Sequence, residues 1–156
     1  MNSEEYDQLL QRMMSVCSKN EKCAYDIEQK LKKKYFQDDE IEKIIYDLQE
    51  SDFINHIRYT EAFVNDKLRF NHWGKRKIAH ALRAKNIDEK IINQKLEEID
   101  PQLYEEILNE ELEKKLSSIG EITDKKGKEK VVRYLLQKGF EYGKIFDIID
   151  KRTNIG

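Results

Sequence analysis

The residue types that catalyse reactions or bind metals are few in this chain, and none are spaced as such chemistry requires. His56, His72 and His80 share no metal-ligand spacing, and Cys17 and Cys23 stand six residues apart, unlike the usual zinc pairs. The sequence has no glycine-rich phosphate loop, no serine elbow and no carboxylate pair in an apolar setting. We therefore predict a protein that is not an enzyme, needs no cofactor and no metal, and keeps both cysteines reduced.

Charge is distributed unevenly along the chain. The net charge is −2, so any basic surface must be local and a general attraction to nucleic acid is not expected. Residues 67–87 contain seven basic side chains and no acidic one, whereas residues 96–113 contain eight acidic side chains and no basic one. The basic side chains are Lys67, Arg69, Lys75, Arg76, Lys77, Arg83 and Lys85.

The basic stretch has two interpretations, which the sequence leaves open. In the first, the basic and acidic stretches are solvated faces that pack against each other. In the second, the basic stretch binds an acidic partner, since Arg76 and Arg83 share a helix face and Trp73, near Phe70, can anchor an interface or stack on a base. Trp73 equally suits packing between units. Sequence-specific DNA reading by a helix-turn-helix is disfavoured, because the helix that would read the DNA, the third of the middle copy, has the acidic start Asp88-Glu89, which would repel phosphates.

The composition favours helices with solvated outer faces. Charged residues make up 38% of the chain and apolar residues another 38%, with one proline and six glycines. No sustained period-two pattern or Asn-Gly hairpin turn predicts a strand. No apolar run approaches the roughly eighteen residues of a membrane span, and the first residues have no signal-peptide core, so we expect a cytoplasmic protein without membrane contact.

An internal repeat supplies the architecture. Six apolar positions recur at an offset of 104, and the first three recur at an offset of 51 as Ile78, Leu82 and Ile87. The pairs at the longer offset are Ile27 and Val131, Leu31 and Leu135, Phe36 and Phe140, Ile41 and Ile145, Ile44 and Ile148, and Ile45 and Ile149.

The residues at the ends and starts of the predicted helices recur from copy to copy as well. Asn86 and Gly139 tolerate the left-handed conformation that ends a helix, whereas Tyr35 occupies the same place and is expected to turn differently. Small residues at helix starts also correspond, namely Cys23, Gly74 and Gly127.

Each copy is expected to contain three helices. The first helices are predicted to follow a cap at Ser3, Asn55 and Asp100, the last with Pro101 in its first turn, and the third helices to begin after Asp38-Asp39, Asp88 and Phe140. The predicted fold is all-α, with three tandem three-helix repeats that share apolar surface in an elongated, curved array. The expected repeats are residues 1–54, residues 55–99 with the basic stretch, and residues 100–156 with an acidic first helix.

The middle copy resembles the RecX family of regulatory proteins. That family has the pattern G-x-I-D, R-Y-A-x-x-F/Y-V, G-x-x-x-I and L-x-x-K-G-I in its central repeat, and it is built from three three-helix repeats. The matching residues are Asp52-Phe53-Ile54-Asn55, Arg58-Tyr59, Ala62-Phe63-Val64, Arg69, Trp73-Gly74, Lys77-Ile78, Leu82-Arg83 and Lys85-Asn86-Ile87.

Four positions depart from the family pattern. Asn55 replaces an acidic cap and Asn86 replaces a glycine, and asparagine serves both purposes. Thr60 replaces an alanine. Asp52 stands in place of a glycine, which we expect to alter the connection between the first two copies.

The resemblance implies a function. It implies a monomeric modulator of the RecA recombinase, acting in homologous recombination, DNA repair and the SOS response. Such a protein lies in the helical groove of the RecA–DNA filament, touches the DNA there and inhibits or tunes strand exchange and ATPase activity. The alternative from charge alone is a free-standing DNA-binding repeat protein that uses the basic surface of the middle copy.

The predicted binding residues come from two sources. The family pattern supplies Arg58, Arg69, Lys77 and Arg83, and it also matches Tyr59, which we expect to lie in the core. Arg58 is also expected to pair with Glu61 or Glu98 and to hold a repeat junction. Charge and aromaticity add the remaining residues, Lys67, Trp73, Lys75, Arg76 and Lys85.

Overall fold

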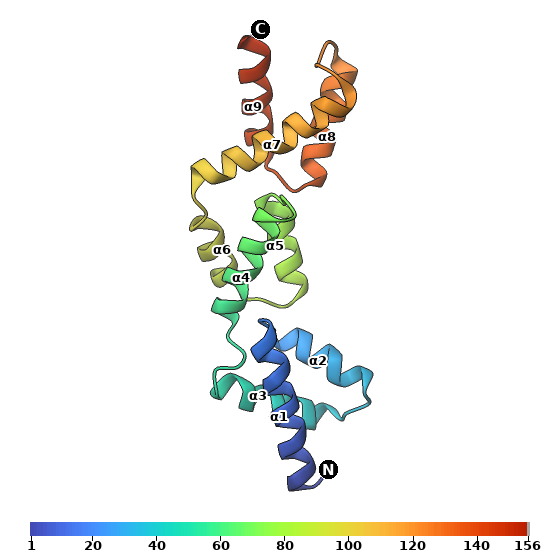
Figure 1. Ribbon diagram of the computed structural model, residues 1–156, viewed down its shortest axis with the longest axis vertical. Coiled ribbons are helices and arrows are strands. Elements are labelled where there is room, and N and C mark those ends of the chain that lie inside the picture. The colour runs from blue at the N-terminus through green and yellow to red at the C-terminus, as the bar shows by residue number, and fades with distance from the viewer. Residues whose placement is uncertain (156) are drawn as a thin grey trace.

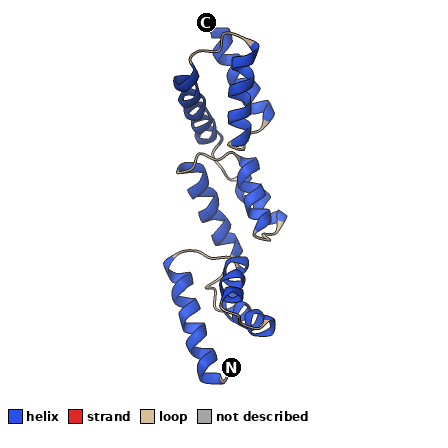
Figure 2. Ribbon diagram, turned by 90° about the vertical axis from the view of Figure 1, so that its right-hand side faces the viewer, coloured by secondary structure: helices blue, strands red, loops and turns tan. Residues whose placement is uncertain are grey.

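The computed structural model describes residues 1–155, with Asn154 and Ile155 described by their helical backbone only. This part of the chain folds into nine α-helices and contains no strand (Figure 2). The helices are α1 (Ser3–Lys19), α2 (Ala24–Lys33), α3 (Asp38–Glu50), α4 (His56–Arg69), α5 (Lys75–Ala84), α6 (Glu89–Glu97), α7 (Pro101–Ile119), α8 (Lys125–Gln137) and α9 (Tyr142–Ile155).

The helices form three consecutive triplets that are stacked along the long axis of the molecule, with the chain ends at opposite poles (Figure 1). The main packing partners within the triplets are α2 with α3, α4 with α6 and α7 with α8. The prediction of an elongated all-helical array of three-helix repeats is therefore confirmed.

The caps of several helices agree with the sequence patterns. The side chain of Asn55 accepts hydrogen bonds from the backbone at the start of α4, and Asp100 caps α7 with Pro101 in the first turn. The predicted cap of α1 and the predicted start of α3 were wrong. Asn2, rather than Ser3, caps α1, because its side chain reaches the Glu5 N–H at 2.8 Å, and α3 begins at Asp38 itself, with Gln37 as its N-cap.

The predicted equivalence of the small residues at helix starts holds for two copies only. Cys23 and Gly74 are the N-cap residues of α2 and α5. Gly127 lies inside α8, because Asp124 caps that helix and accepts a hydrogen bond from the Gly127 N–H at 2.8 Å. The third copy therefore gains part of a turn at this helix start.

The turns between the second and third helices all contain one left-handed residue. Asn86 and Gly139 have φ of 60° and 98°, as expected, and Tyr35 has φ of 64°, so the prediction of a different turn at Tyr35 was wrong. Each turn has the same backbone hydrogen bond, in which the hydrophobe that follows donates to the fifth residue before it; Phe36, Ile87 and Phe140 donate to Leu31, Leu82 and Leu135. The repeated hydrophobe thus fixes the turn, whatever the left-handed residue is.

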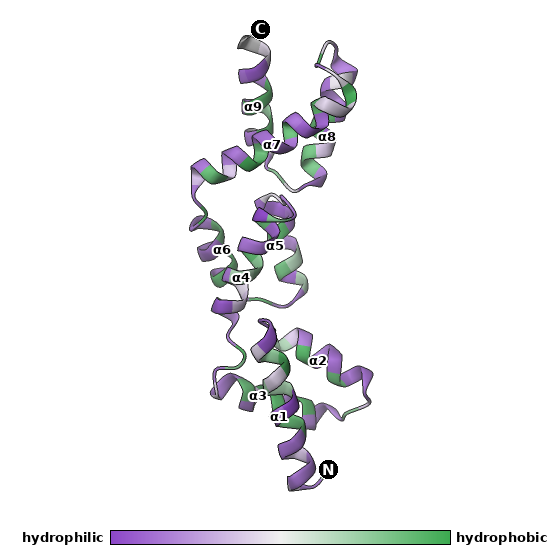
Figure 3. Ribbon diagram, viewed as in Figure 1, coloured by the Kyte–Doolittle hydropathy of each residue, from purple (hydrophilic) through white to green (hydrophobic). Residues whose placement is uncertain are grey.

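The buried side chains form two clusters. Apolar stripes run along the inner sides of the helices (Figure 3). The first cluster belongs to the first triplet and extends from Leu9 to Ile54. The second cluster is shared by the other two triplets, from Tyr59 to Ile149, and it also includes Cys23 of the first triplet. Cys17 and Cys23 are free thiols in these cores, and burial raises the pKa of each.

Candidate partner-binding surface

The start of α5 lies against the turn between α8 and α9. The Gly74 N–H donates to the Lys138 carbonyl at 2.7 Å, and the Arg76 N–H donates to the Gly139 carbonyl at 3.0 Å. A Cβ at Gly74 would lie only 2.3 Å from the Gly139 carbonyl carbon, so only glycine allows this approach. The second and third triplets are therefore joined backbone to backbone at this junction.

The first turn of α5 carries three consecutive cations, Lys75, Arg76 and Lys77, and no acidic residue. The positive end of the helix dipole disfavours cations at such a place. Two of the first backbone amides of this turn are already bonded, because the Lys75 N–H donates to the Tyr104 hydroxyl at 2.9 Å and the Arg76 N–H donates to the Gly139 carbonyl. The three side chains are therefore the main groups that can bind a partner here. A run of cations that lowers the stability of a helix, and that no ion pair offsets, is typical of a binding site.

A hollow of about 860 Å³ lies between α5, α8 and the turn before α9. We call it the cationic hollow. Its only carboxylate is that of Glu141, which accepts a hydrogen bond from Tyr104. Burial, followed by this hydrogen bond, raises the pKa of Tyr104. The hollow's basic lining residues are Lys75, Arg76, Lys77, Arg83 and Arg133.

Four of these five cations make no ion pair with another side chain in the described part of the molecule. The exception is Arg83, which pairs with Glu89 at the start of α6. Lys75 lies over the ring of Tyr104, with its Nζ 4.9 Å from the ring centre. Arg76 and Arg133 are exposed. The hollow therefore has a strong uncompensated positive charge.

Trp73 connects the cationic hollow to the opposite side of α5. It is half-buried against the shared core and lies edge-on to Phe63, with ring centres 6.5 Å apart. The Nζ atoms of Lys67 and Lys77 lie 4.8 and 4.6 Å from the centre of its ring. The ring thus holds two cations in place by cation–π contact. These three contacts of Trp73 are all with residues of its own triplet, so packing between units and binding of a partner both stay predictions for this ring.

Lys67 and Lys85 line a second hollow, between the first and second triplets, which we call the lysine hollow. It has four further basic residues from the α1–α2 turn and α2, but also the carboxylates of Glu21, Asp26 and Asp66. Lys85 pairs with Asp26. The lysine hollow thus has six lysines and three carboxylates, whereas the cationic hollow has five cations and one carboxylate. The four further basic residues are Lys22, Lys30, Lys33 and Lys34.

Arg58 lies at the junction between the first and second triplets. It pairs with Glu21 and with Asp52, and it donates to the Asp52 carbonyl at 2.8 Å. The junction role is observed, but the predicted partners were wrong. Glu61 and Glu98 both face Lys95 instead, because α4 and α6 of the same triplet bring them together.

The acidic stretch in α7 does not pair with the seven basic side chains. Glu111, which is only 3% exposed, contacts His72 at 2.8 Å, Tyr134 at 2.6 Å and Lys138 at 3.6 Å. Exposed carboxylates of α7 pair with Lys151 and Arg152 of α9. Among the residues described, the charged groups of the two stretches therefore meet only through His72, which contacts Glu110 and Glu111, and through none of the seven Lys and Arg side chains.

The nine predicted binding residues thus do not form one surface. Lys75, Arg76, Lys77 and Arg83 lie in the cationic hollow, Lys67 and Lys85 in the lysine hollow, and Trp73 links the two groups. Arg58 lies in the junction, and Arg69 is exposed at the end of α4 beside Phe70.

Arg133 is the residue that sequence reasoning missed. It lies in α8, whose five basic residues are interrupted by one acidic residue, Glu129, so the search for a basic run without acidic residues did not identify it. Its position in the cationic hollow follows from the packing of the third triplet onto the start of α5. Only the contact between Gly74 and Gly139 could have indicated this proximity, and the sequence alone does not reveal that contact.

Neither metal binding nor membrane insertion finds support in residues 1–155. No three histidine, cysteine or acidic side chains in this part gather as metal ligands would. No helix there combines the length and apolar character that a membrane span needs.

These features define a class of helical-repeat protein, built from tandem three-helix units, with a charged surface at a unit junction. Residues 55–96 match the second three-helix domain of RecX, and residues 103–149 match the third. The chain belongs to the RecX family.

The regulatory protein RecX of Clostridium acetobutylicum is 34% identical over 142 residues, which cover 88% of this chain and 65% of that protein. The regulatory protein RecX of Clostridium beijerinckii is 30% identical over 151 residues, covering 96% and 70%. The crystal structure of RecX from Lactobacillus salivarius is 24% identical, covers 99% of this chain and all of that one, and superposes with a TM-score of 0.82, which shows a shared fold. The family is one of regulatory, non-enzymatic proteins.

Proposed function

We propose that this chain binds the filament that RecA forms on DNA and, lying in its helical groove, limits ATPase activity and strand exchange. The RecX resemblance supplies the partner, and three stacked units suit contact with successive protomers of a helical filament. The role belongs to recombination and DNA repair in the cytoplasm, and a single copy of the chain is taken as the acting species.

The observation that carries this proposal is the uncompensated charge of the cationic hollow. Arg76 and Arg133 come from different triplets, are exposed and have no carboxylate partner among the described residues. Such charges raise the rate and specificity of association with an acidic surface more than they raise stability. The hollow is therefore the proposed contact with the filament.

The experiment is a titration of the chain into RecA from the same source, turning over ATP on single-stranded DNA. We expect inhibition at substoichiometric ratios. The double variant Arg76→Glu/Arg133→Glu should need at least about tenfold more protein for the same inhibition, as expected for interfacial charge reversal. Arg12→Glu/Lys19→Glu makes the same charge change at exposed positions of α1 and should inhibit like the original chain. Absence of inhibition at every ratio would contradict the proposal.

The second candidate function is DNA binding without RecA. The first turn of α5 favours it, because three adjacent cations there have no carboxylate partner among the described residues and can meet phosphates. It requires binding to bare DNA that weakens steeply as salt rises, with Arg76→Glu/Arg133→Glu reducing the slope. The net charge of −2 argues against it. Negligible binding to bare DNA at physiological salt, with inhibition of RecA retained, would exclude this candidate.

A further inference from the structure

An apolar hollow adjoins the cationic hollow on the third triplet. Val132 and Leu136 line it from α8, and Tyr142 and Phe146 line it from α9. Each pair is four residues apart, so each presents two side chains on one helix face. We call this hollow, of about 520 Å³, the aromatic groove.

The aromatic groove is exposed to solvent although its lining is apolar. Tyr142 is 53% exposed and Phe146 is 37% exposed, while Val132 and Leu136 are half-buried. The two rings stack on each other, with centres 5.5 Å apart and planes 19° apart. Four apolar side chains gathered at one exposed place are typical of a surface that binds a partner.

Cations surround the groove and connect it to the cationic hollow. Lys125 and Lys128 of α8 also line it, and Lys128 Nζ lies 5.5 Å from the centre of the Phe146 ring. Arg133, Leu136 and Tyr142 line both hollows, so the two are continuous. Glu129 is the only carboxylate of the groove.

We propose that the continuous surface binds an extended acidic peptide segment, with an apolar side chain in the aromatic groove and carboxylates beside Arg76 and Arg133. The inference deepens the proposed function and rests on it, since it names the chemistry of the partner segment at the same site. Cations beside an apolar groove complement carboxylates beside an aliphatic or aromatic side chain.

The groove fits a peptide better than a nucleic acid. A base stacks on a free aromatic face, whereas Tyr142 and Phe146 each turn one face to the other and Lys128 lies over Phe146. Val132 and Leu136 of α8 are aliphatic, and they pack around a side chain rather than along a flat ring.

The test measures binding by fluorescence anisotropy, without RecA. The probe is a labelled synthetic peptide of aspartate and glutamate residues with two leucines, and a second peptide has serine in place of each leucine. The leucine peptide should bind at least about tenfold more tightly than the serine peptide, as expected for a buried apolar anchor. A labelled oligothymidylate of similar charge serves as the nucleic-acid probe.

Two variants probe the two halves of the surface. Tyr142→Ser removes an exposed ring of the groove, and Arg133→Glu reverses the charge shared by both hollows; each should weaken the leucine peptide about tenfold. Phe70→Ser and Arg12→Glu change an exposed aromatic and an exposed cation elsewhere and should have no effect. Arg133→Glu keeps the test decisive if Tyr142→Ser misfolds, since Arg133 is exposed and makes no ion pair among the described residues.

Three outcomes would overturn the inference. They are equal binding of the two peptides, no effect of either variant, and tight binding of the oligothymidylate with none of the peptide. If the chain inhibits RecA but does not bind the leucine peptide, the proposed function stands and only the inference of a peptide-binding surface is rejected. Peptide binding without inhibition of RecA would reject the proposed function instead.

Discussion

Single residues with positive φ mark the places where the fold constrains the backbone most. Tyr35, Asp52, His72 and Asn86 are the non-glycine residues of this kind in the described chain. Asp52 has φ of 60° at the position where the family pattern has glycine, and its carboxylate accepts from Asn55 at 3.0 Å. The departure noted in the sequence is therefore accommodated by a short polar side chain that bonds locally.

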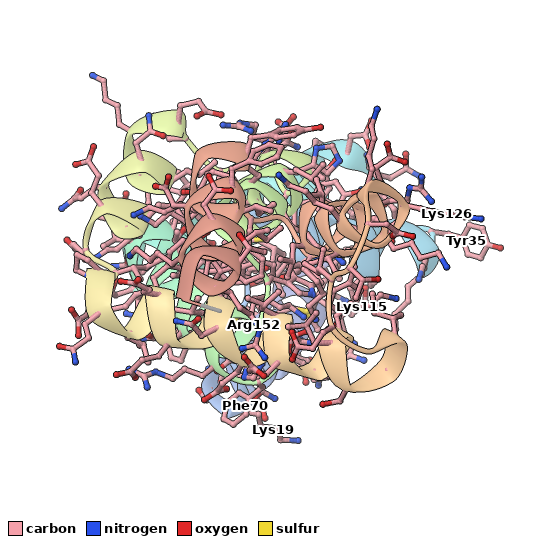
Figure 4. The ribbon with its side chains drawn as sticks, turned by 90° about the horizontal axis from the view of Figure 1, so that it is seen from above. Lys19, Tyr35, Phe70, Lys115, Lys126 and Arg152 are labelled. Carbon is pink, nitrogen blue, oxygen red and sulfur yellow. The ribbon has the colours of Figure 1, made fainter. Side chains whose placement is uncertain are left out.

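Tyr35 has the same left-handed backbone conformation, but no local side-chain hydrogen bond in the described chain offsets its strain. It is 90% exposed, and its side chain projects away from the body of the molecule (Figure 4). Tyr35→Gly should raise the free energy of unfolding by about 1 kcal/mol, because the left-handed conformation is costly for residues with a Cβ. Tyr35→Ala keeps the Cβ and should have little effect. Urea unfolding of the three proteins measures this; equal gains in both variants would contradict the assignment of strain.

Glu111 makes the stability dependent on pH. Burial tends to raise its pKa, but hydrogen bonds with Tyr134 and His72 and the charge of Lys138 outweigh burial and lower it below 4.5. A lowered pKa in the folded state means that Glu111 stabilises the fold above pH 4.5, and that this contribution disappears as the pH falls through the folded pKa.

The variant Glu111→Gln tests whether the stabilisation by Glu111 is lost as the pH falls. At pH 7 it should lower the free energy of unfolding by about 2 kcal/mol, the typical contribution of hydrogen bonds to a charged group. The difference from the original chain should shrink as the pH falls below 4.5. Glu106→Gln, an exposed change on the same helix, should show little difference at any pH. A deficit in Glu111→Gln that is constant with pH would contradict the account.

At the scale of elements, the closest contact is that between α5 and the turn from α8 to α9. Gly74→Ala should lower the free energy of unfolding by about 2 kcal/mol, because its Cβ would overlap the backbone of Gly139. Gly143→Ala is the matched control in α9, where a Cβ meets open space, and it should stabilise by about 0.5 kcal/mol. Thermal and urea unfolding measure both changes. Equal effects of the two variants would mean that the junction is not tightly packed.

The sequence predicted the elements well and their contacts poorly. Repeated apolar spacing and the caps at Asn55 and Asp100 are local properties, so they identified helices and triplets. The left-handed Tyr35 was missed because its turn is set by the packing of Phe36, which the identity of residue 35 does not reveal. The partner Glu21 of Arg58 was missed because it lies in the turn between α1 and α2, and only the packing of the first two triplets brings that turn to the start of α4.

The whole molecule is built on two cores of unequal extent. The first triplet has its own cluster, and the second and third triplets share one. We propose that the boundaries of the three repeats lie between residues 54 and 55 and between residues 99 and 100, and that the first triplet opens independently of the other two. Cores that are separate can unfold separately.

Hydrogen exchange tests this division. Met13→Ala removes a buried side chain of the first core and should cost about 3 kcal/mol there, so exchange should quicken in α1, α2 and α3 but not in α7, α8 and α9. Leu108→Ala, in the shared core, should instead quicken exchange from α4 to α9. Uniform quickening across all helices in either variant would show a single cooperative unit.

The candidate surface is also a property of the whole molecule. Composition and charge runs identified the basic residues of α5, and their first turn remains the centre of the proposed site. Arg133 and the aromatic groove could not be predicted as parts of this site, because residue 76 and residues 133–146 are far apart in the sequence. Only the stacking of one triplet on the next brings them together.

Co-sedimentation with RecA filaments tests the central claim most directly. The chain is mixed with RecA assembled on single-stranded DNA, or with the same DNA alone, at physiological salt. We predict that the chain sediments with the filament and stays in solution with bare DNA, and that Arg76→Glu/Arg133→Glu lowers the bound fraction while Arg12→Glu/Lys19→Glu does not. A chain that stays in solution with the filament, or sediments equally with bare DNA, would contradict the account.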